Sequence, residues 1–468
     1  MSEWTDFKIE NLCDVGSSKR IKMADYVKSG VPFFRSKEII ELSKGNSIST
    51  ELFITQEQFK SISDKFGHPS IGDILLTSVG TLGVPYHVEA QELPFYFKDG
   101  NLTWFKNFRN VINSRWLYYW LLSPQGKNKI NEISIGSTQR AITIVALKGI
   151  SLKVPSIENQ NSAVSILDSI THKIENNWRM NATLEEMAQA IFKSWFVDFD
   201  PVHAKMEALK NGGSEDDARI AAMCTISGKS ADELSHLKSE NAEAYNELAT
   251  TADAFPSAFT DSPLGQIPEG WEVKPLKSYL TIKRGGSPRP IKDYISKNGL
   301  PWLKIADATA ECSPYIFETK EFIKEEGLRK TVLLKKGALI LSNSATPGLP
   351  KFLELDTCVH DGWLHFPKVT HFTNEYLYFL FLKLRNEFIA MGNGSVFTNL
   401  KTDIVKDYEV VVADQIILNK FTEIARLLLN QVLNSRKQNQ SLAETRDALL
   451  PKLLSGEVDV SQVQFDEV

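Results

Sequence analysis

Few residues of this sequence have the types and spacing that a catalytic centre needs. Gly228–Lys229–Ser230 imitates the end of a phosphate-binding loop, but Met223 stands where such a loop requires its first glycine. Neither the Asn-Pro-Pro-aromatic motif of an amino-methyltransferase nor the acidic pair and Glu-x-Lys of a nuclease is present. The eight histidines, among them His68, His87, His360 and His365, lack metal-ligand spacing. We therefore predict no catalytic residue and no metal site, and we favour a role in molecular recognition over a role in catalysis.

Composition indicates an ordinary reduced protein with more than one domain. The chain has 468 residues, of which 42% are hydrophobic and 24% charged. Its net charge of −5 argues mildly against nucleic-acid binding, although a total charge hides local patches. Four cysteines without a CxxC pair suggest neither zinc nor disulfides. The start lacks a signal-peptide layout and no apolar run could span a membrane, so we expect a cytoplasmic protein without a membrane partner.

Two long segments, 160–196 and 415–454, carry apolar residues at steps of three and four, which place one stripe along a helix. In the first segment these are Leu167, Ile170, Ile174, Trp178, Leu184, Met187, Ile191 and Trp195, and in the second they are Ile417, Phe421, Ile424, Leu428, Val432, Leu442, Thr445, Leu449 and Leu453. The first helix would be about 55 Å long. Such a helix needs a partner along its stripe, so we predict that the two form an antiparallel coiled coil.

The regions before the two helices repeat each other. Gly30–Phe34 returns as Gly299–Leu303, and Gly72–Pro85 returns as Gly337–Pro350. Further matches in the same order are Asp99–Gly100 with Asp361–Gly362, Trp116–Leu122 with Tyr376–Leu382, and Gly136–Ser137 with Gly394–Ser395. Ordered matches of this kind indicate an internal duplication. Within the first copy, Gly30–Phe34 leads into a strand-like segment, Ile71–Thr77 is typical of a turn that feeds a buried strand, and Ile150–Pro155 alternates as a half-buried strand does. We also predict a short helix over Trp116–Leu122 and, in the second copy, a tight turn at Gly392–Gly394.

These observations predict an α+β fold with two similar mixed α/β domains, joined by two long helices and related by an approximate two-fold axis. The expected boundaries are 1–156 for the first domain, 157–200 for the first long helix, 201–263 for a polar linker with one or two short helices, 264–413 for the second domain, 414–456 for the second long helix and 457–468 for a tail.

With the duplication established, the chain resembles the specificity (S) subunit of type I restriction–modification systems. The motifs that carry the resemblance are the repeated turn and strand at Gly72–Thr77 and Gly337–Ser342, Gly136–Gln139 ahead of the strand that ends at Pro155, Leu184–Phe199, and Arg446–Glu457. The second copy departs from the first at Ala413, where the first has Pro155, and at Thr398–Asn399, where the first has Arg140–Ala141. These departures leave the recognised bases open.

The resemblance implies a non-catalytic subunit whose two domains are target recognition domains. Each would read one half of an asymmetric bipartite site in double-stranded DNA, while the helices set the gap between the half-sites. The helices would also dock two modification (M) subunits, which bind S-adenosylmethionine and methylate adenine. Restriction (R) subunits would supply translocation and cleavage that depend on ATP and Mg. The chain itself is then expected to bind no cofactor directly.

DNA sequence is read mainly by polar and basic side chains at base edges. In the first copy we predict contacts from the loop residues Lys19, Arg20, Arg35, Ser78, Thr81, Gln139 and Arg140. In the second copy we predict contacts from Lys283, Arg284, Arg289, Lys304, Asn343, Ser344, Thr346, Asn399 and Lys401. The segment Lys283–Arg289 is the best single candidate, because its glycines allow close approach and its cations can meet phosphates. Against this, a basic surface loop usually only solvates the fold.

Two alternatives remain open at this point. A coiled-coil interaction scaffold without a DNA role would fit the negative net charge. A self-sufficient DNA methyltransferase is disfavoured by the missing motifs. Methyltransferase partners in a pull-down would favour the S-subunit hypothesis over the scaffold, and binding of S-adenosylmethionine by the chain alone would favour the methyltransferase.

Overall fold

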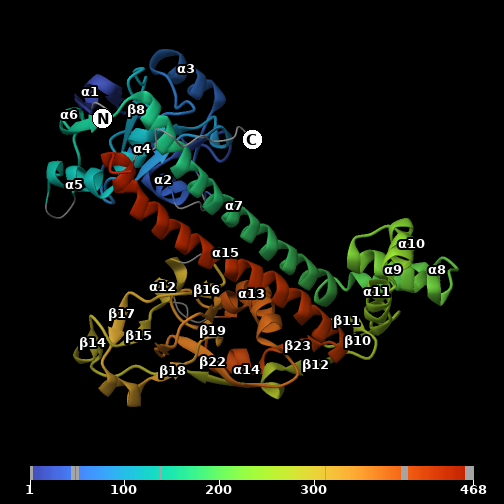
Figure 1. Cartoon of the computed structure of the whole chain (residues 1–468). Coiled ribbons are helices and arrows are strands. Elements are labelled where there is room, and N and C mark those ends of the chain that lie inside the picture. Colours follow the sequence, from blue (N-terminus) through green and yellow to red (C-terminus); the bar gives the residue numbers. More distant parts are fainter. Residues whose placement is uncertain are drawn as a thin grey trace. The chain divides into compact units, whose positions relative to one another are not determined.

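The structure is a computed structural model that describes residues 4–43, 48, 52–136, 140–310, 313–391 and 399–458. The chain forms two compact units. Unit 1 comprises Met1–Arg179 and Ser435–Val468, and unit 2 comprises Met180–Asn434. Figure 1 colours the chain along its sequence and labels the elements of each unit. Both units mix sheets with helices, as the sequence predicts.

Unit 1 contains a four-stranded antiparallel sheet, in the order β2 (Asp14–Gly16), β8 (Leu102–Lys106), β5 (Ile74–Thr77) and β6 (Pro85–His87). A second sheet has the order β4 (Phe53–Ile54), β3 (Val31–Phe34) and β7 (Tyr96–Phe97), and β1 (Thr5–Lys8) pairs with β9 (Ser151–Val154). The helices before the long helix are α1 (Ile9–Leu12), α2 (Ser36–Ser43), α3 (Gln56–Phe66), α4 (Ser114–Leu122), α5 (Pro124–Ile133) and α6 (Ile144–Lys148). The predicted strands and the predicted helix over 116–122 are confirmed.

Unit 2 repeats this plan with more strands. One sheet has the order β13 (Leu280–Arg284), β22 (Trp363–Val369), β19 (Leu339–Ser342), β20 (Pro350–Leu353) and β16 (Tyr315–Ile316). The other has the order β14 (Ile295–Ser296), β17 (Glu321–Ile323), β15 (Leu300–Leu303), β21 (Thr357–Val359) and β18 (Val332–Leu334). The remaining strands are β12 (Glu272–Pro275), which pairs with β23 (Glu409–Val412), and the hairpin β10 (Phe259–Ser262) with β11 (Gly265–Pro268). The helices around these sheets are α12 (Ile305–Ala310), α13 (Asn374–Met391) and α14 (Thr402–Asp407).

The duplication extends to individual hydrogen bonds. In unit 1 the Thr77 N–H donates to Val84 O at 3.1 Å and the Thr77 hydroxyl accepts from Val84 N at 2.9 Å. In unit 2 Ser342 makes the same two bonds with Leu349, at 3.0 and 2.9 Å. We call the part of unit 1 from β1 to β9 (residues 5–154) the first head, and the part of unit 2 from β12 to β23 (residues 272–412) the second head. The two heads thus share a scaffold, and the predicted match at Gly394–Ser395 and the predicted turn at Gly392–Gly394 lie outside the described residues.

The two long helices are α7 (Ile157–Phe196, 40 residues) and α15 (Gln415–Ser455, 41 residues). In unit 1 they run antiparallel, because Asn177 bonds Gln438 and Asn439 whereas Val164 and Leu167 share a core with Leu450 and Leu453. In unit 2 the end of α7 packs on the start of α15, with the rings of Phe192 and Phe421 5.6 Å apart. The predicted stripe is wrong at two positions: Met187 is 49% exposed while its neighbour Ala188 is buried, and Thr445 is exposed.

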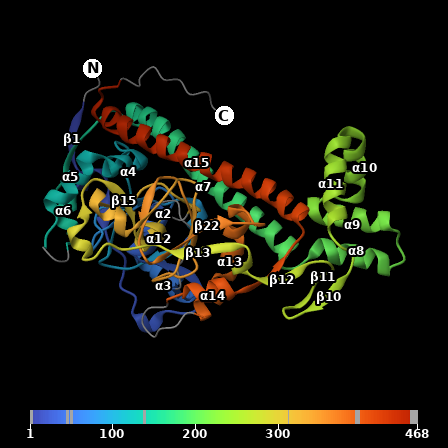
Figure 2. The same cartoon turned by 90° about the horizontal axis from the view of Figure 1, so that it is seen from below.

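The predicted linker is in fact a small helical bundle. Four helices follow α7, namely α8 (Asp200–Lys210), α9 (Glu215–Ser227), α10 (Ala231–Glu240) and α11 (Ala242–Ala254). Figures 1 and 2 both show them gathered together, with the hairpin β10–β11 beside them. The prediction of one or two helices was wrong because small residues, chiefly alanines, supply much of the bundle core, which includes Ala222, Met223, Leu234 and Ala252. We call residues 200–254 the helical insertion.

Candidate nucleic-acid interface

The topology of each main sheet brings three loops to one edge. Strands β2 and β5 both run antiparallel to β8, which lies between them. The carboxyl ends of β2 and β5 therefore meet the amino end of β8 at the same edge. In unit 2 the strands β13, β22 and β19 repeat this arrangement. We call this edge the reading edge of each head, since most of the loop residues selected from the sequence lie along it.

In unit 1 the reading edge is organised around the turn Lys98–Asn101, which joins β7 to β8. The Ser78 N–H donates to Asn101 O at 2.8 Å, and the Ser17 hydroxyl donates to Leu102 O at 3.0 Å and accepts from the Gly100 N–H at 3.3 Å. The loops after β2 and β5 are thus bound to one turn. The loop after β5 also bonds the segment that follows α5, because Ile142 N donates to Ser78 O at 3.0 Å.

In unit 2 the turn His360–Gly362, between β21 and β22, corresponds to the turn Lys98–Asn101 of unit 1. The Arg284 guanidinium donates to Asp361 O at 3.1 and 2.8 Å, and the Ser287 hydroxyl donates to the Asp361 carboxylate at 2.5 Å. The hydrogen bond from Ser287 lowers the pKa of Asp361 more than burial raises it. The Asn343 N–H donates to Gly362 O at 2.9 Å, and Asn343 O accepts from Leu400 N at 2.8 Å. The loops after β13 and β19 are therefore joined at Asp361 and Gly362.

In the first head, some of the predicted residues are exposed, whereas the side chains of others are already bonded or buried within the fold. Lys19, Arg20, Thr81 and Arg140 are exposed, although the Arg140 guanidinium also donates to Asn131 Oδ1 at 3.2 Å and to the Ser134 hydroxyl. The Arg35 guanidinium is committed to the fully buried Glu38, at 2.7 and 3.3 Å, since a buried carboxylate needs a cation. Ser78 is 3% exposed and its hydroxyl shares a 2.6 Å hydrogen bond with Thr103, so its side chain belongs to the sheet rather than to the surface. The predicted Gln139 lies outside the described residues.

The second head shows the same division. Lys283, Arg284, Arg289, Asn399 and Lys401 are exposed, and the Arg289 side chain is 83% exposed. Three other predicted residues are less available: Lys304 is exposed but bonds Glu321 at 2.5 Å, and Ser344 and Thr346 are half-buried. Asn343 is only 3% exposed, because its backbone is bonded on both sides within the reading edge. Its side chain is therefore less available than the predicted DNA contact requires.

Two features of the second reading edge were not predicted from the sequence. Asp361 organises the second reading edge, and its recurrence with Asp99 in the repeated Asp-Gly pair was the signal that could have identified it. The Lys330 backbone lies beside the loop after β13, since an added Cβ at Gly286 would lie 2.9 Å from Lys330 O, and the exposed Lys330 ammonium donates to the Tyr294 hydroxyl at 2.7 Å. This position was not predicted because it comes close to the loop only in the folded chain, and no local sequence motif indicates the contact.

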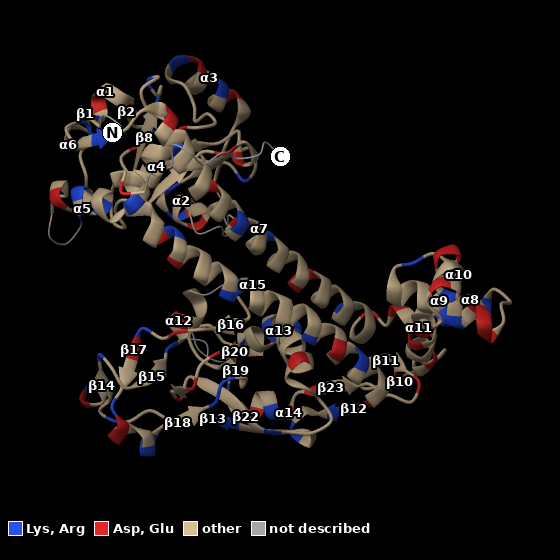
Figure 3. Ribbon diagram, viewed as in Figure 1, with Lys and Arg blue, Asp and Glu red and all other residues tan. Residues whose placement is uncertain are grey.

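The charges are distributed unevenly in unit 2. Figure 3 shows Lys and Arg along β13, whereas the helical insertion carries Asp and Glu together with Lys and Arg. The first turns of α9 and α10 carry Glu215, Asp216, Asp217, Asp232 and Glu233. The negative total charge therefore does not describe the reading edge, and the mild objection to nucleic-acid binding loses its force.

The geometry offers donors and cations rather than reacting groups. Among the described residues, no group of three or more His, Cys, Asp or Glu side chains could hold a metal ion. Gly228 ends α9 in the left-handed conformation and Ser230 caps α10, so the tripeptide that imitates a phosphate loop has a structural role. Exposed Lys, Arg, Thr and Asn side chains on joined loops are the chemistry with which proteins contact phosphates and base edges.

Comparison with known proteins decides between the open alternatives. A family model described as the type I restriction modification DNA specificity domain matches residues 1–186 and 268–434. The chain belongs to this family. It is accordingly a DNA specificity subunit, a non-catalytic component of a type I restriction–modification system that works with DNA and with other subunits. The scaffold alternative is not favoured, and the family model leaves out residues 187–267, which contain the helical insertion.

Individual specificity subunits are similar over most of the chain. The HindI specificity subunit of Haemophilus influenzae is 29% identical over 402 residues, which cover 83% of this chain and 86% of that protein. The MjaIX specificity subunit of Methanocaldococcus jannaschii is 26% identical over 487 residues, covering 98% and 95%. A crystal structure of the S subunit of a type I system from M. genitalium covers 97% of this chain and 96% of its own, with a TM-score of 0.51 and 16% identity. The shared fold confirms the predicted α+β class with two sheet-rich domains and long helices.

Proposed function

We propose that each head reads one half of an asymmetric bipartite DNA site through its reading edge. The observation that carries this proposal is that the same loops meet around the same turn in both heads, while their exposed side chains differ. Shared scaffolds with different surface residues suit two half-sites of different sequence. In the first head the exposed predicted residues are Lys19, Arg20, Thr81 and Arg140, and in the second they are Lys283, Arg284, Arg289, Asn399 and Lys401.

Within this proposal the exposed residues divide by chemistry. Lys283 and Arg289 are exposed cations that suit phosphates, which position a protein on DNA without reading sequence. Asn399 carries an amide of the kind that reads adenine, and Thr81 carries a hydroxyl and a methyl group. Arg284 already donates to Asp361 O, so it both orders the loop and presents charge. A reading edge of this kind would hold register through its cations and discriminate bases through its amide and hydroxyl groups.

The long helices would serve as spacer and docking surface. A helix of 40 residues is about 60 Å long, which exceeds one DNA turn of about 34–36 Å. We infer that the antiparallel pairing of α7 and α15 sets the unread gap between the half-sites. Two methyltransferase subunits carrying S-adenosylmethionine would dock on the helices, and restriction subunits would bring ATP and Mg. The chain would then bind no cofactor directly and act in the cytoplasm, where the DNA is.

The spacer role is tested by lengthening both helices together. Seven residues inserted after Arg179 and seven after Asn434 keep the heptad faces aligned and add about 10 Å, or about three base pairs. Sequencing of methylated bases is expected to show unchanged half-sites separated by a longer gap. The control replaces the exposed residues of one existing heptad without changing its length. An unchanged gap in the lengthened protein would contradict the spacer role.

The assignment of the cofactor to partner subunits has its own test. The purified chain is expected not to retain labelled S-adenosylmethionine, whereas its complex with methyltransferase subunits should retain it. Retention by the chain alone at a similar affinity would contradict this part of the proposal and revive the methyltransferase alternative.

A further inference from the structure

Each head is held to its own long helix by an ion pair. In unit 1 the Arg115 guanidinium at the start of α4 donates to the Asp168 carboxylate of α7 at 2.8 Å. In unit 2 the Arg426 guanidinium of α15 donates to the Glu375 carboxylate at the start of α13, also at 2.8 Å. In the first pair the head supplies the cation, and in the second pair the helix supplies it.

The four residues occupy equivalent positions in the duplication. Helix α4 corresponds to α13 through the match of Trp116–Leu122 with Tyr376–Leu382, which places Arg115 opposite Glu375 in the alignment. Strands β9 and β23, which lead into α7 and α15, correspond residue by residue. The sequence offset that aligns β9 with β23 also aligns Asp168 of α7 with Arg426 of α15. The same contact is therefore present in both copies with its charges reversed.

The first pair is part of a larger network that fixes its polarity. The Arg115 guanidinium also bonds Glu89 at 2.5 Å, and Asp168 accepts from the Tyr119 hydroxyl at 2.7 Å. The side chains of Arg115 and Asp168 are only 18% and 19% exposed. A glutamate in place of Arg115 would face two carboxylates there, with little water to screen them.

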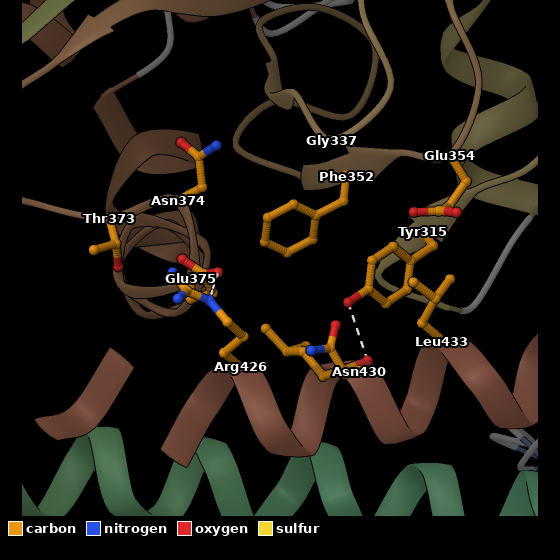
Figure 4. A pocket seen from close by; sticks show the side chains of 11 residues that line it. Tyr315, Gly337, Phe352, Glu354, Thr373, Asn374, Glu375, Arg426, Asn430 and Leu433 are labelled. Atoms are coloured by element: carbon orange, nitrogen blue, oxygen red, sulfur yellow. Dashed lines mark hydrogen bonds and ion pairs between the residues drawn. The ribbon is translucent and has the colours of Figure 1, made fainter. Parts of the chain in front are cut away.

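The second pair borders a pocket of about 360 Å³ between the second head and α15. Figure 4 shows Arg426 reaching Glu375 from the helix, with Phe352 and Tyr315 on the head side. Glu375 is 18% exposed and Arg426 is 55% exposed. An arginine in place of Glu375 would meet the Arg426 cation, so each head carries the charge that suits only its own helix.

We propose that these reversed ion pairs match each head to its slot, the first head to α7 and the second head to α15. A head moved to the other slot would bring Arg115 against Arg426, or Glu375 against Asp168. The pairs then act as positioning residues that fix which half-site each end of the molecule reads, and in this respect alone the inference depends on the proposed function.

The direct test places the first head in the second slot. In the chimera, residues 5–154 replace residues 272–412, so a copy of Arg115 faces Arg426. Arg426→Asp is expected to raise the thermal unfolding midpoint of this chimera by about 5 °C or more, and to lower the midpoint of the unaltered chain by a similar amount because Asp would face Glu375. If the charges match each head to its slot, Arg426→Asp must change the midpoint in opposite directions in the chimera and in the unaltered chain. An effect of the same sign in both would overturn the proposal.

A second measurement covers the case in which the chimera does not fold. In the intact chain, Glu375→Arg and Arg426→Glu are each expected to lower the midpoint, and the double variant is expected to recover at least half of the summed loss. Additive losses in the double variant would also overturn the proposal. In cells, the chimera with Arg426→Asp should direct methylation to two copies of one half-site. If even the unaltered chain directs methylation to a site that is not bipartite, the proposed function fails while the result on stability stands by itself.

Discussion

The loop after β13 depends on a glycine that has no room for a side chain. The Gly285 N–H donates to Trp363 O at 2.9 Å, and an added Cβ would lie 2.2 Å from His360 O and 2.5 Å from Val359 O. Both are backbone atoms, one at the end of β21 and one in the turn His360–Gly362 of the second reading edge, so they cannot rotate away. Gly285→Ala must therefore displace the loop from the turn.

The cost of this displacement is that of overpacking, about 1–3 kcal/mol of unfolding free energy. For a unit of this size the midpoint of thermal unfolding should fall by about 3–10 °C. Because Arg284 and Ser287 flank the displaced residue and bond Asp361, the geometry of the second reading edge should change as well. Sequencing of methylated bases is expected to show a relaxed second half-site beside an intact first half-site.

Gly16 provides the matched control. It ends β2, the strand of the first head that corresponds to β13, its φ is not in the left-handed region, and an added Cβ would have nothing within 4 Å. Gly16→Ala should leave the midpoint unchanged or raise it slightly, since alanine restricts the unfolded chain. Equal effects of the two substitutions, or loss of the first half-site in Gly285→Ala, would show that the contacts of Gly285 do not shape the second reading edge.

Three further predictions follow from single residues. Burial raises the pKa of Glu38, but hydrogen bonds from Arg35 lower it below the usual 4.5 overall. The charged carboxylate therefore stabilises the fold above pH 4.5, and this stabilisation is lost as the pH falls through the lowered pKa. The difference in thermal midpoint between the natural chain and Glu38→Gln should close at acid pH, and a constant difference would contradict this. Lys283→Ala should weaken DNA binding about equally for all sequences and reduce the slope of log affinity against log salt by about 1, measured by titration at several salt concentrations, whereas an unchanged slope would remove Lys283 from the phosphate contacts. Phe255, the residue after the helical insertion, is 1% exposed and its ring lies 5.4 Å from that of Trp195. Phe255→Ala should therefore lower the unfolding free energy by about 3–5 kcal/mol in a denaturant titration, and a loss under about 1 kcal/mol would mean that Phe255 is not part of the unit 2 core.

Much of the fold could be predicted from periodicity and repetition. The apolar stripes located the long helices to within a few residues, since helices with one buried face carry a strong pattern. The repeat of Gly72–Pro85 in Gly337–Pro350 identified two loops that prove to share their hydrogen bonds. The helical insertion was underestimated because its core is small and its surface acidic, which resembles the composition of a linker.

The candidate site was only partly predictable, because residue type does not reveal what a side chain already contacts. Arg35 has the chemistry of a DNA-reading residue, yet a buried carboxylate three positions later takes its guanidinium. Ser78 and Asn343 are polar residues after buried strands, and both are drawn into the sheet edge by backbone bonds to the central turns. Such partners depend on which loops meet in space, and no local pattern shows that.

Exchange of one head tests most directly whether the two heads read DNA separately. Residues 5–154 are replaced by the corresponding head of another specificity subunit that keeps an arginine at the position of Arg115. Methylated bases in the DNA of cells that carry the complete system are then sequenced. One half-site is expected to change while the other half-site and the gap stay as they were. A change in both half-sites, or in neither, would contradict separate reading by the two heads.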